Sequence, residues 1–488
     1  EPSPTTLTAF RASPRSLRGL RLIRSHPKEQ PLTQEDLTLL GLLRLDMIGT
    51  MTVTPKGEPG LLSLAHLNPP SPKGELYTLL KPTLVHLCPV NFDTFIRELE
   101  ADLQRQSGSH TMAQKPTAIL VSASPQNKAD QEERLIELAE LASSADLTVI
   151  DRLVQRTQSG HHRFQLGSGK LKDVLMHAMQ KGADLLIFDQ DLAPAQLRAI
   201  DEITDLTVID RTQLILDIFA QRAHSREGKV QVELAQLRYL LPRLSGQGTS
   251  LSRLGGGIGS RGPGETKLET DRRRIRERID HLEREIEGFA RHQDQRRSRR
   301  VRQAFPVLSI VGYTNAGKST LLNVLTKSEV STAPRVFETL DTTSRRLHFP
   351  HGREVILTDT VGFIRDLPKD LLAAFRTTLD EMRDADLLLH VVDAGAKDLA
   401  AHIASVETVL QSLALDQIPR VLVFNKCDQL PAGQAEVLCR RYSAIGISAL
   451  QPKTLPPLLR HLEERLADLV PLDGSSKKPT TQGPTLAS

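Results

Sequence analysis

The chain has 488 residues, of which 39% are hydrophobic, and a formal net charge of +4. This length predicts about three domains with ordinary cores and excludes a wholly disordered protein. Aromatic residues make up only 3% of the chain and tryptophan is absent. Platforms for base stacking are therefore scarce, which argues against an RRM-type or OB-type reader of single-stranded nucleic acid.

The three cysteines, Cys88, Cys427 and Cys439, form no CxxC pair. Such a sparse, odd set argues for a reducing compartment and against a disulfide or zinc framework. The chain has no run of about 18 apolar residues, which a membrane span would need, and its first residues lack the apolar stretch of a signal peptide. We expect a soluble, cytoplasmic monomer without a membrane span, with room for a membrane-peripheral fraction.

Residues 1–115 predict a small accessory α+β domain. Short strands are expected at Arg21–Ile23 and Met51–Thr54, and a helix at Leu37–Leu45. We expect a polar linker near Gln104–Lys115, which leads into the next domain.

Residues 116–225 alternate strands and helices, which predicts βαβ units and a mainly parallel sheet. The letters DLTVIDR occur twice, at Asp146–Arg152 and at Asp205–Arg211. We interpret this repeat as two equivalent buried strand ends. The expected strands are Ala118–Val121, Leu147–Asp151, Leu185–Phe188 and Leu206–Asp210, and the expected helices are Glu132–Ala142, Lys172–Gln180 and Pro194–Ile203.

Residues 226–305 predict a helical arm that is interrupted by the glycine-rich segment 246–264. Helices are expected at Val230–Leu241 and Thr266–Arg300, and their spacing of apolar residues suits an antiparallel pair. The narrow apolar seam of the second helix consists of Ile275, Ile279, Leu282 and Ile286. A second α/β domain is expected over 306–470, and the polar tail 471–488 is expected to be disordered.

The strongest motif of the chain lies between the expected strand Val307–Val311 and the expected helix Thr320–Leu325. A glycine loop in this context is a P-loop, whose backbone N–H groups wrap phosphates at a helix N-terminus. Lys318 would reach the β- and γ-phosphates as a catalytic cation, and Ser319 would offer its hydroxyl to Mg²⁺. The candidate phosphate-binding residues are Gly312, Tyr313, Thr314, Asn315, Ala316, Gly317, Lys318 and Ser319.

Two further motifs follow in the order that a GTPase requires. The first is DxxG, in which Asp359 would hold Mg²⁺ through water and the Gly362 amide would meet the γ-phosphate. The second is NKxD, in which Asp428 can accept hydrogen bonds from the guanine N1 and N2 donors, a pattern that adenine lacks. Together these motifs predict a GTPase rather than an ATPase. The candidate residues are Asp359, Thr360, Val361, Gly362, Asn425, Lys426, Cys427 and Asp428, with Ser448, Ala449 and Leu450 as the last base-contacting loop.

The segment between the P-loop and DxxG should close on the γ-phosphate. We assign Thr339 as the Mg²⁺ ligand and catalytic threonine, while Thr342 and Thr343 remain alternatives, as does a solvated loop threonine. The candidate residues of this segment are Phe337, Glu338, Thr339, Leu340 and Asp341.

Phe363 follows the DxxG glycine, where many GTPases carry the Gln that orients water. A phenyl ring cannot position water, so hydrolysis should be slow or should depend on another group. The alternative is that Phe363 is a core residue. Asn315 is compatible with a K⁺ ligand that bridges the phosphates, although capping of its own loop is the simpler interpretation.

At these motifs the chain resembles the HflX family of translational GTPases, over about residues 116–450. The stretches that carry the resemblance are Val208–Phe219, Val232–Leu244, Gly255–Arg274, Gly312–Ser319 and Thr358–Ile364. The resemblance implies an N-terminal α/β domain, a helical arm and a G domain, a hydrophobic residue at position 363, and binding to the large ribosomal subunit with dissociation or rescue of stalled or idle ribosomes. Residues 1–115 lie outside this shared core, and Gln451–Lys453 stands where a glycine-containing turn is more usual.

An RNA partner agrees with the residues themselves. Segment 246–264 holds eight glycines, two arginines and no acid, so it permits close approach to phosphates; a flexible linker is the alternative. Arg272–Arg274 and Arg296–Arg302 add basic clusters, for which a merely solvated face is the alternative. Large-subunit rRNA is thus the expected partner. Gly167–Lys170 resembles a second P-loop, but we expect Ser168 to cap a helix there.

A GTP-dependent binding module or a ribosome assembly factor with little turnover remains the main alternative function. An Obg-like or tRNA-modifying GTPase would require other flanking domains, and the stretch Gly255–Arg274 argues against it.

Overall fold

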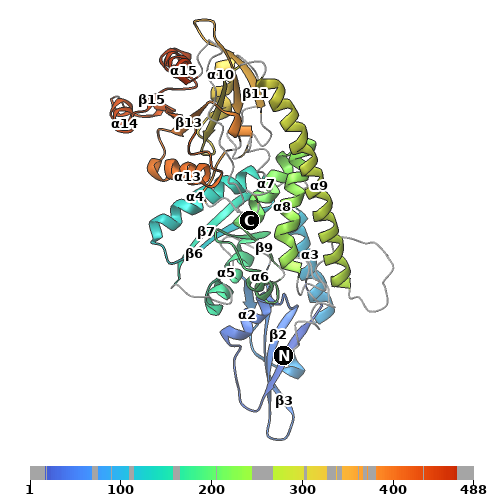
Figure 1. Cartoon of the computed structure of the whole chain (residues 1–488). Coiled ribbons are helices and arrows are strands. Elements are labelled where there is room, and N and C mark those ends of the chain that lie inside the picture. Colours follow the sequence, from blue (N-terminus) through green and yellow to red (C-terminus); the bar gives the residue numbers. More distant parts are fainter. Residues whose placement is uncertain are drawn as a thin grey trace. The chain divides into compact units, whose positions relative to one another are not determined.

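The computed structural model divides the chain into two compact units, each built from two stretches (Figure 1). The first unit comprises Glu1–Asp217 with Tyr239–Arg276, and the second comprises Ile218–Arg238 with Glu277–Ser488. The described residues contain no helix that is both long and apolar enough to cross a membrane. The structure describes residues 17, 19–68, 75–88, 91–108, 115–157, 165–204, 206–244, 267–301, 305–326, 337, 343–360, 362–365, 371, 381–431 and 433–469.

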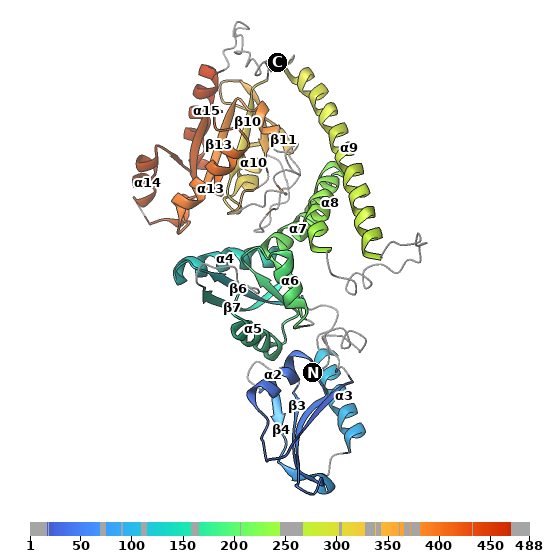
Figure 2. The same cartoon turned by 60° about the horizontal axis from the view of Figure 1, so that its bottom comes forward.

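The first unit begins with a small mixed sheet in the order β1-β2-β3-β4, with β5 also pairing with β3 (Figure 2). Its helix α2 starts where the Thr33 hydroxyl accepts the Asp36 N–H and the Asp36 carboxylate accepts the Thr33 N–H. This reciprocal capping satisfies two amides that a helix start leaves without partners. The elements are β1 (Arg21–His26), α2 (Gln34–Leu42), β2 (Met47–Val53), β3 (Pro59–Leu67), β4 (Tyr77–Leu79), β5 (Thr83–Leu84), η1 (Val85–Leu87) and α3 (Phe92–Gly108).

The expected linker near Gln104–Lys115 is wrong in its first part, because α3 continues to Gly108. Leu99 of α3 is buried in the same core as Leu40 of α2 and Ile48 of β2, and the helix continues past this contact into a polar stretch with no apolar spacing to indicate it. The α+β character expected for this part of the chain is confirmed.

The second sheet of the first unit is fully parallel, in the order β7-β6-β8-β9. Helices α5 and α6 pack on one face of it through buried aliphatic side chains such as Leu171 and Ile200. At one point α2 approaches α5 so closely that a Cβ on Gly41 would lie 2.6 Å from the Met176 Sδ. The elements are β6 (Thr117–Ser124), α4 (Lys128–Ser144), β7 (Thr148–Arg156), α5 (Ser168–Lys181), β8 (Leu185–Phe188), α6 (Pro194–Asp201), β9 (Thr207–Asp210) and α7 (Arg211–Arg222).

The two DLTVIDR repeats are not equivalent strand ends, so that interpretation is wrong. Asp151 pairs with Ile119 in the middle of β7, is half-exposed and lies 2.8 Å from the His177 Nε2. Asp210 pairs with Phe188 at the last residue of β9 and is buried. The same letters serve two roles because β7 runs on to Arg156, whereas β9 ends at Asp210 and α7 begins at once.

Buried Asp210 anchors the end of helix α8 and the turn after it. Its carboxylate accepts hydrogen bonds from the Tyr239 hydroxyl at 2.5 Å, from the Arg243 guanidinium at 3.2 Å, and from the backbone N–H groups of Leu192 and Gln213. The Arg243 guanidinium also lies 3.4 Å over the Tyr239 ring. The chain that leads into segment 246–264 is therefore fixed by charge-assisted hydrogen bonds.

The second unit contains most of α8 (Arg226–Leu240) and of α9 (Lys267–Val301). Ion pairs join the two helices: Arg226 with Glu285 at 2.7 Å, Arg278 with Glu233 at 2.7 Å, and Arg238 with Glu283 at 2.6 Å. Of the expected apolar seam on α9, Ile279 and Leu282 are buried. The antiparallel course of the pair stays a prediction.

The larger sheet of the second unit has the order β11-β12-β10-β13-β14-β15, and only β11 is antiparallel to its neighbour (Figure 1). Helices α10 and α15 cover one face through a leucine-rich core, and α13 packs on the opposite face against Val392 and Phe424. The elements are β10 (Val307–Gly312), α10 (Lys318–Thr326), β11 (Thr343–His348), β12 (Glu354–Asp359), η4 (Glu381–Asp384), β13 (Leu387–Asp393), α13 (Leu399–Ser412), β14 (Arg420–Asn425), η5 (Cys427–Gln429), α14 (Gln434–Tyr442), β15 (Ile445–Gly446), η6 (Pro452–Thr454) and α15 (Pro456–Leu469).

Replacing Tyr239 with Phe should lower the free energy of unfolding by about 1.5–3 kcal/mol, because buried Asp210 loses one hydrogen-bond donor. Urea unfolding of the full chain measures this change. Tyr77→Phe is the matched control, since the Tyr77 hydroxyl has no hydrogen bond within the described part of the chain. An equal loss of stability in both variants would contradict the anchoring role of Tyr239.

Candidate nucleotide-binding site

The glycine loop predicted as a P-loop lies between β10 and α10, where the chain turns from the sheet into a helix. Gly312 has φ +154 and a Cβ there would collide with the Val391 carbonyl oxygen. Gly317 has φ +88 and a Cβ there would collide with the Asn425 amide. Both positions therefore require glycine, because a side chain would push the loop off the two neighbouring strands. Asn315 has φ +60, which Asn tolerates; its role toward K⁺ stays a prediction.

Lys318 is buried at the start of α10, and its Nζ donates to the Tyr313 carbonyl oxygen at 2.8 Å. Burial lowers the pKa of Lys318 to about 8, although the nearby Asp359 carboxylate opposes this shift. The ammonium group is thus mainly charged at neutral pH. A phosphate anion that binds beside Lys318 would stabilise this buried positive charge.

Ser319 and Asp359 bring a hydroxyl and a carboxylate together below the P-loop, with Ser319 Oγ 2.8 Å from Asp359 Oδ2. Asp359 is fully buried and its other oxygen accepts the Thr360 N–H at 3.0 Å. Oxygen ligands of this kind suit Mg²⁺, which keeps several waters and binds through few protein groups. The residues present therefore fit a magnesium ion.

Gly362 lies against the P-loop, since a Cβ there would be 2.8 Å from Thr314 Cγ2 and 3.0 Å from Lys318 Nζ. The residue after it, Phe363, is 1% exposed. Its backbone accepts the Thr314 N–H at 2.7 Å and donates to the Gly312 carbonyl oxygen at 3.1 Å. The interpretation of Phe363 as a core residue is thus confirmed.

Asn425, the last residue of β14, connects the P-loop with the last loop of the site. Its Nδ2 donates to the Ala316 carbonyl oxygen at 2.9 Å, and its Oδ1 accepts the Ala449 N–H at 2.9 Å. Because the side chain is buried, these hydrogen bonds would be costly to break. Asn425 therefore holds the phosphate and base loops at a set distance.

The rest of the NKxD motif presents an exposed carboxylate beside a fixed lysine. Lys426 adopts φ +61 and its Nζ lies 2.7 Å from Asp393 Oδ2. Asp428 is exposed in η5. Burial raises the pKa of the intervening Cys427 thiol to about 11, so Cys427 acts there as a packing residue. This arrangement leaves Asp428 accessible to a base.

The last loop closes through the side chain of Thr454. The Thr454 hydroxyl accepts the Ser448 N–H at 3.0 Å and lies 3.1 Å and 2.8 Å from the carbonyl oxygens of Ser448 and Gln451. Leu450 is 74% exposed at the tip. Sequence reasoning missed Thr454, whose position six residues after Ser448 carries no motif.

Some predicted site residues lie outside the described part of the chain: Glu338, Thr339, Leu340, Asp341 and Val361. Phe337 is described, and it is buried with φ +58. Its ring packs edge-on against Phe219, with centroids 4.5 Å apart. Both residues belong to the second unit.

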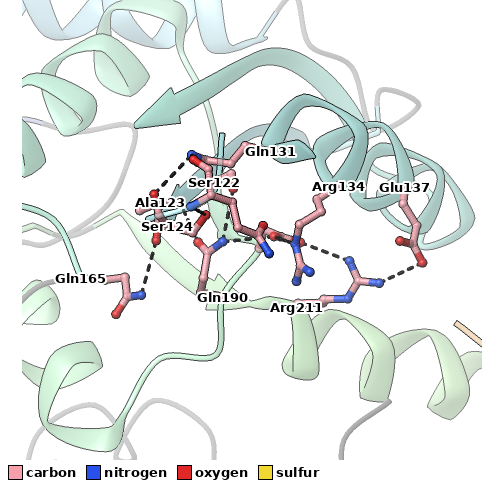
Figure 3. Close-up of polar contacts among 11 residues, drawn as sticks. Ser122, Ala123, Ser124, Gln131, Arg134, Glu137, Gln165, Gln190 and Arg211 are labelled. Carbon is pink, nitrogen blue, oxygen red and sulfur yellow. Dashed lines mark hydrogen bonds and ion pairs between the residues drawn. The ribbon is translucent and has the colours of Figure 1, made fainter. Parts of the chain in front are cut away.

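The first unit offers a second place to look for a nucleotide, at the carboxyl ends of β6 and β8, where the strand order reverses. Figure 3 shows this edge bridged by side chains. Gln190 accepts the Ala123 N–H at 2.8 Å and donates to Ser122 Oγ at 3.2 Å. Arg211 bonds Glu137 at 2.9 Å and Asp189 at 3.1 Å. These groups bind one another, which gives no support to a ligand there.

The expected helix cap at Gly167–Lys170 is wrong in detail. The residue that caps α5 is Gly167, without a side-chain hydrogen bond, and Ser168 is the first helical residue. Gly167 has the extended backbone angles usual at this position but no side chain, so it cannot accept an N–H of the first turn as a serine would.

Comparison with family models matches three parts of the chain. "GTP-binding GTPase N-terminal" covers residues 132–220, "GTP-binding GTPase Middle Region" covers residues 222–300, and "50S ribosome-binding GTPase" covers residues 307–426. The last match includes the P-loop and the NKxD motif up to Lys426.

Curated relatives are similar over most of their length. GTPase HflX of Caldanaerobacter subterraneus subsp. tengcongensis is 49% identical over 69% of this chain and 79% of its own. GTPase HflX of Alkalihalophilus pseudofirmus is 50% identical over 62% of this chain and 72% of its own. Among solved structures, a GTP-binding protein of Sulfolobus solfataricus in complex with GDP is 26% identical over 72% of this chain and 99% of its own, with a TM-score of 0.40.

The lowered pKa of Lys318 predicts that GDP binding weakens as the pH rises through about 8. In the free protein the ammonium loses its proton there, whereas bound phosphates keep it protonated. Between pH 6.5 and 8.5 the Kd for GDP should rise about fourfold. Fluorescence titration measures it. Lys318→Arg, whose guanidinium stays charged, should bind with little pH dependence; a flat profile for the unmodified chain would contradict the assignment.

Proposed function

This chain belongs to the HflX family of GTPases, and from that premise we propose that its hydrolysis of GTP drives an action on the large ribosomal subunit: dissociation or rescue of stalled or idle ribosomes. The relatives at 49–50% identity and the match to the model described as "50S ribosome-binding GTPase" support this assignment. The observation that carries the GTPase site is Asn425, which ties the phosphate loop to the base loops.

The proposed reaction is in-line attack of water on the γ-phosphate. Lys318 neutralises the negative charge that develops on the β- and γ-phosphate oxygens. Its hydrogen bond to the Tyr313 carbonyl oxygen already holds the ammonium group in place. The Gly362 amide meets the γ-phosphate, and its closeness to Lys318 supports this role. Thr339 is proposed to close over the same group from the preceding segment.

Ser319 and Thr339 are the proposed protein ligands for Mg²⁺, with Asp359 acting through water. The 2.8 Å contact between the Ser319 hydroxyl and Asp359 supports this set. When bound, the ion supplies charge neutralisation between the β- and γ-phosphates. Buried Asp359 orients the hydroxyl of Ser319 toward the same place.

Guanine selection is assigned to Asp428, whose exposed carboxylate can accept from both N1 and N2 of the base. Lys426, held by Asp393, buttresses the base, and the Ala449–Asn425 hydrogen bond places the loop that meets O6. An adenine base would leave the carboxylate without donors, which penalises ATP.

The switch segment before DxxG is proposed to report nucleotide state to the helical arm. Phe337 lies only two residues from Thr339, and its ring contacts Phe219 of α7. Helix α7 precedes α8 in the chain, and side-chain ion pairs join α8 to α9. Closure of Thr339 on the γ-phosphate would therefore pull on a side chain packed against α7, the helix that leads into the arm.

Ribosome engagement is assigned to segment 246–264 and to the basic residues of α9. Two observations support it. The Tyr239–Asp210–Arg243 cluster fixes the chain just before this segment. On α9, Arg274 and Arg276 are exposed and have no ion pair within the described residues, so their charges are available to phosphates.

Burial of Phe363 favours one other function, a binding module that uses GTP mainly as a clamp, including a role in ribosome assembly. The ring is buried and carries no polar group, so intrinsic turnover has no orienting side chain at this position. Single-turnover hydrolysis in the presence of large subunits separates the two functions, because a clamp would not be accelerated.

Asp428→Asn should lower GTP affinity by at least about 100-fold, because two charge-assisted hydrogen bonds are lost. The same variant should gain affinity for xanthosine triphosphate, whose O2 can accept from the new amide. Competition binding measures both nucleotides. Asp416→Asn, an exposed carboxylate of the same unit, is the control and should bind GTP like the unmodified chain; an unchanged preference in Asp428→Asn would refute the assignment.

Purified large subunits should raise the GTPase rate of the full chain by roughly tenfold or more, as partner-supplied groups do for other GTPases. A variant that lacks residues 246–264 should keep its intrinsic rate and lose this stimulation. Replacing Arg253 and Arg261 with Ala in the full-length chain removes the positive charge of this segment but keeps its length, so it tests the two contributions separately. No stimulation of the unmodified chain at any excess of subunits would reject the ribosome-coupled function.

A further inference from the structure

Tyr313, the second residue of the P-loop, has contacts that a phosphate-binding role does not require. It is 5% exposed. Its ring stacks on the His402 ring of α13 with centroids 4.0 Å apart and planes inclined by 4°. Its hydroxyl accepts the Arg365 backbone N–H at 2.8 Å. One side chain thus joins the P-loop, the segment after DxxG and a helix on the face of the sheet.

The segment Gly362–Arg365 is held to the same neighbours by its own atoms. Phe363 forms an isolated parallel bridge with Tyr313. The Arg365 guanidinium lies 3.1 Å from the Asp398 carboxylate, and Asp398 is the N-cap of α13. The start of α13 therefore anchors this segment twice, through Asp398 directly and through His402 by way of the Tyr313 ring.

The position of Gly362 follows from these contacts. The backbone of Phe363 is paired on both sides to the P-loop. Beyond it, the Ile364 carbonyl oxygen accepts the Ser405 hydroxyl of α13 at 3.5 Å, and the Arg365 nitrogen donates to the Tyr313 hydroxyl. Lys318 donates to the carbonyl oxygen of the same tyrosine. Tyr313 thus sets the spacing between the lysine and the glycine that flank the expected γ-phosphate position.

We propose that Tyr313 is a positioning residue for GTP hydrolysis, which holds the start of the post-DxxG segment against α13 so that the Gly362 amide faces the γ-phosphate. The proposal rests on the role proposed above for Gly362. Through Gly362, Tyr313 helps the site to distinguish GTP, which has a γ-phosphate, from GDP, which lacks one. The tyrosine acts through Gly362 and touches no reacting atom.

Tyr313→Phe tests the hydroxyl while keeping the stacked ring. One lost hydrogen bond changes an equilibrium by about 2- to 13-fold. We expect kcat for GTP to fall about fivefold in the full chain, and affinity for a non-hydrolysable GTP analogue to fall similarly, while GDP affinity stays within about twofold. Equal losses for GDP and the analogue, or no change in kcat and in the analogue-to-GDP ratio, would overturn the proposal.

Tyr442→Phe is the matched control, because Tyr442 of α14 lies in the same unit and its hydroxyl has no hydrogen bond within the described residues. It should leave kcat and both affinities unchanged. A second pair of variants tests the stack: His402→Phe keeps a ring against Tyr313 and should retain most of kcat, whereas His402→Ala removes the ring and should lower kcat. Equal kcat values in this pair would count against the stacked contact.

Gly362→Ala separates failure of this proposal from failure of the role of Gly362. If that variant leaves the analogue-to-GDP ratio unchanged, Gly362 does not read the γ-phosphate and both ideas fall. If Gly362→Ala lowers the ratio and Tyr313→Phe does not, only the positioning role of Tyr313 is rejected. Loss of the ratio in both variants supports the two together.

Discussion

A single buried amide, that of Asn425, connects the loops on which the nucleotide site depends. It donates to the P-loop at the Ala316 carbonyl oxygen and accepts the Ala449 N–H of the last loop, and it packs so closely on Gly317 that no side chain fits there. Loops are ordinarily the most variable part of a sheet protein. Here two of them are held at a common distance by one side chain at the end of β14, and these are the loops that we assign to the phosphates and to the base.

The long stretches that make the chain resemble its family serve structure as much as chemistry. Asp210 and Arg211 lie at the junction of β9 and α7. The Asp210 carboxylate accepts hydrogen bonds from Tyr239 and Arg243. Arg211 forms a buried ion pair with Asp189. Charges this buried are tolerated only with full sets of partners. Loss of one partner would therefore leave the other charges uncompensated.

Local sequence predicted most elements around the nucleotide site, because strand–loop–helix context and glycine spacing are short-range properties. The strand Leu185–Phe188 was predicted with the bounds that the structure has, and β10 begins as expected at Val307. The end of α3 was mistaken for a linker, because Gln104–Gly108 carries no apolar residue at helical spacing, although the helix continues to Gly108. Thr454 was missed although its partners Ser448 and Gln451 are near in the chain, because no motif marks a threonine that closes this loop.

The sequence by itself determined the class of ligand, because the P-loop, DxxG and NKxD each place a particular chemical group next to a particular strand end. It also established that the water-orienting Gln is replaced by Phe363. Only the tertiary structure decided that this ring is buried and that Tyr313 reaches both Arg365 and His402. The physical reason is range: motifs record contacts within a few residues, whereas burial and stacking join residues that are distant in the chain.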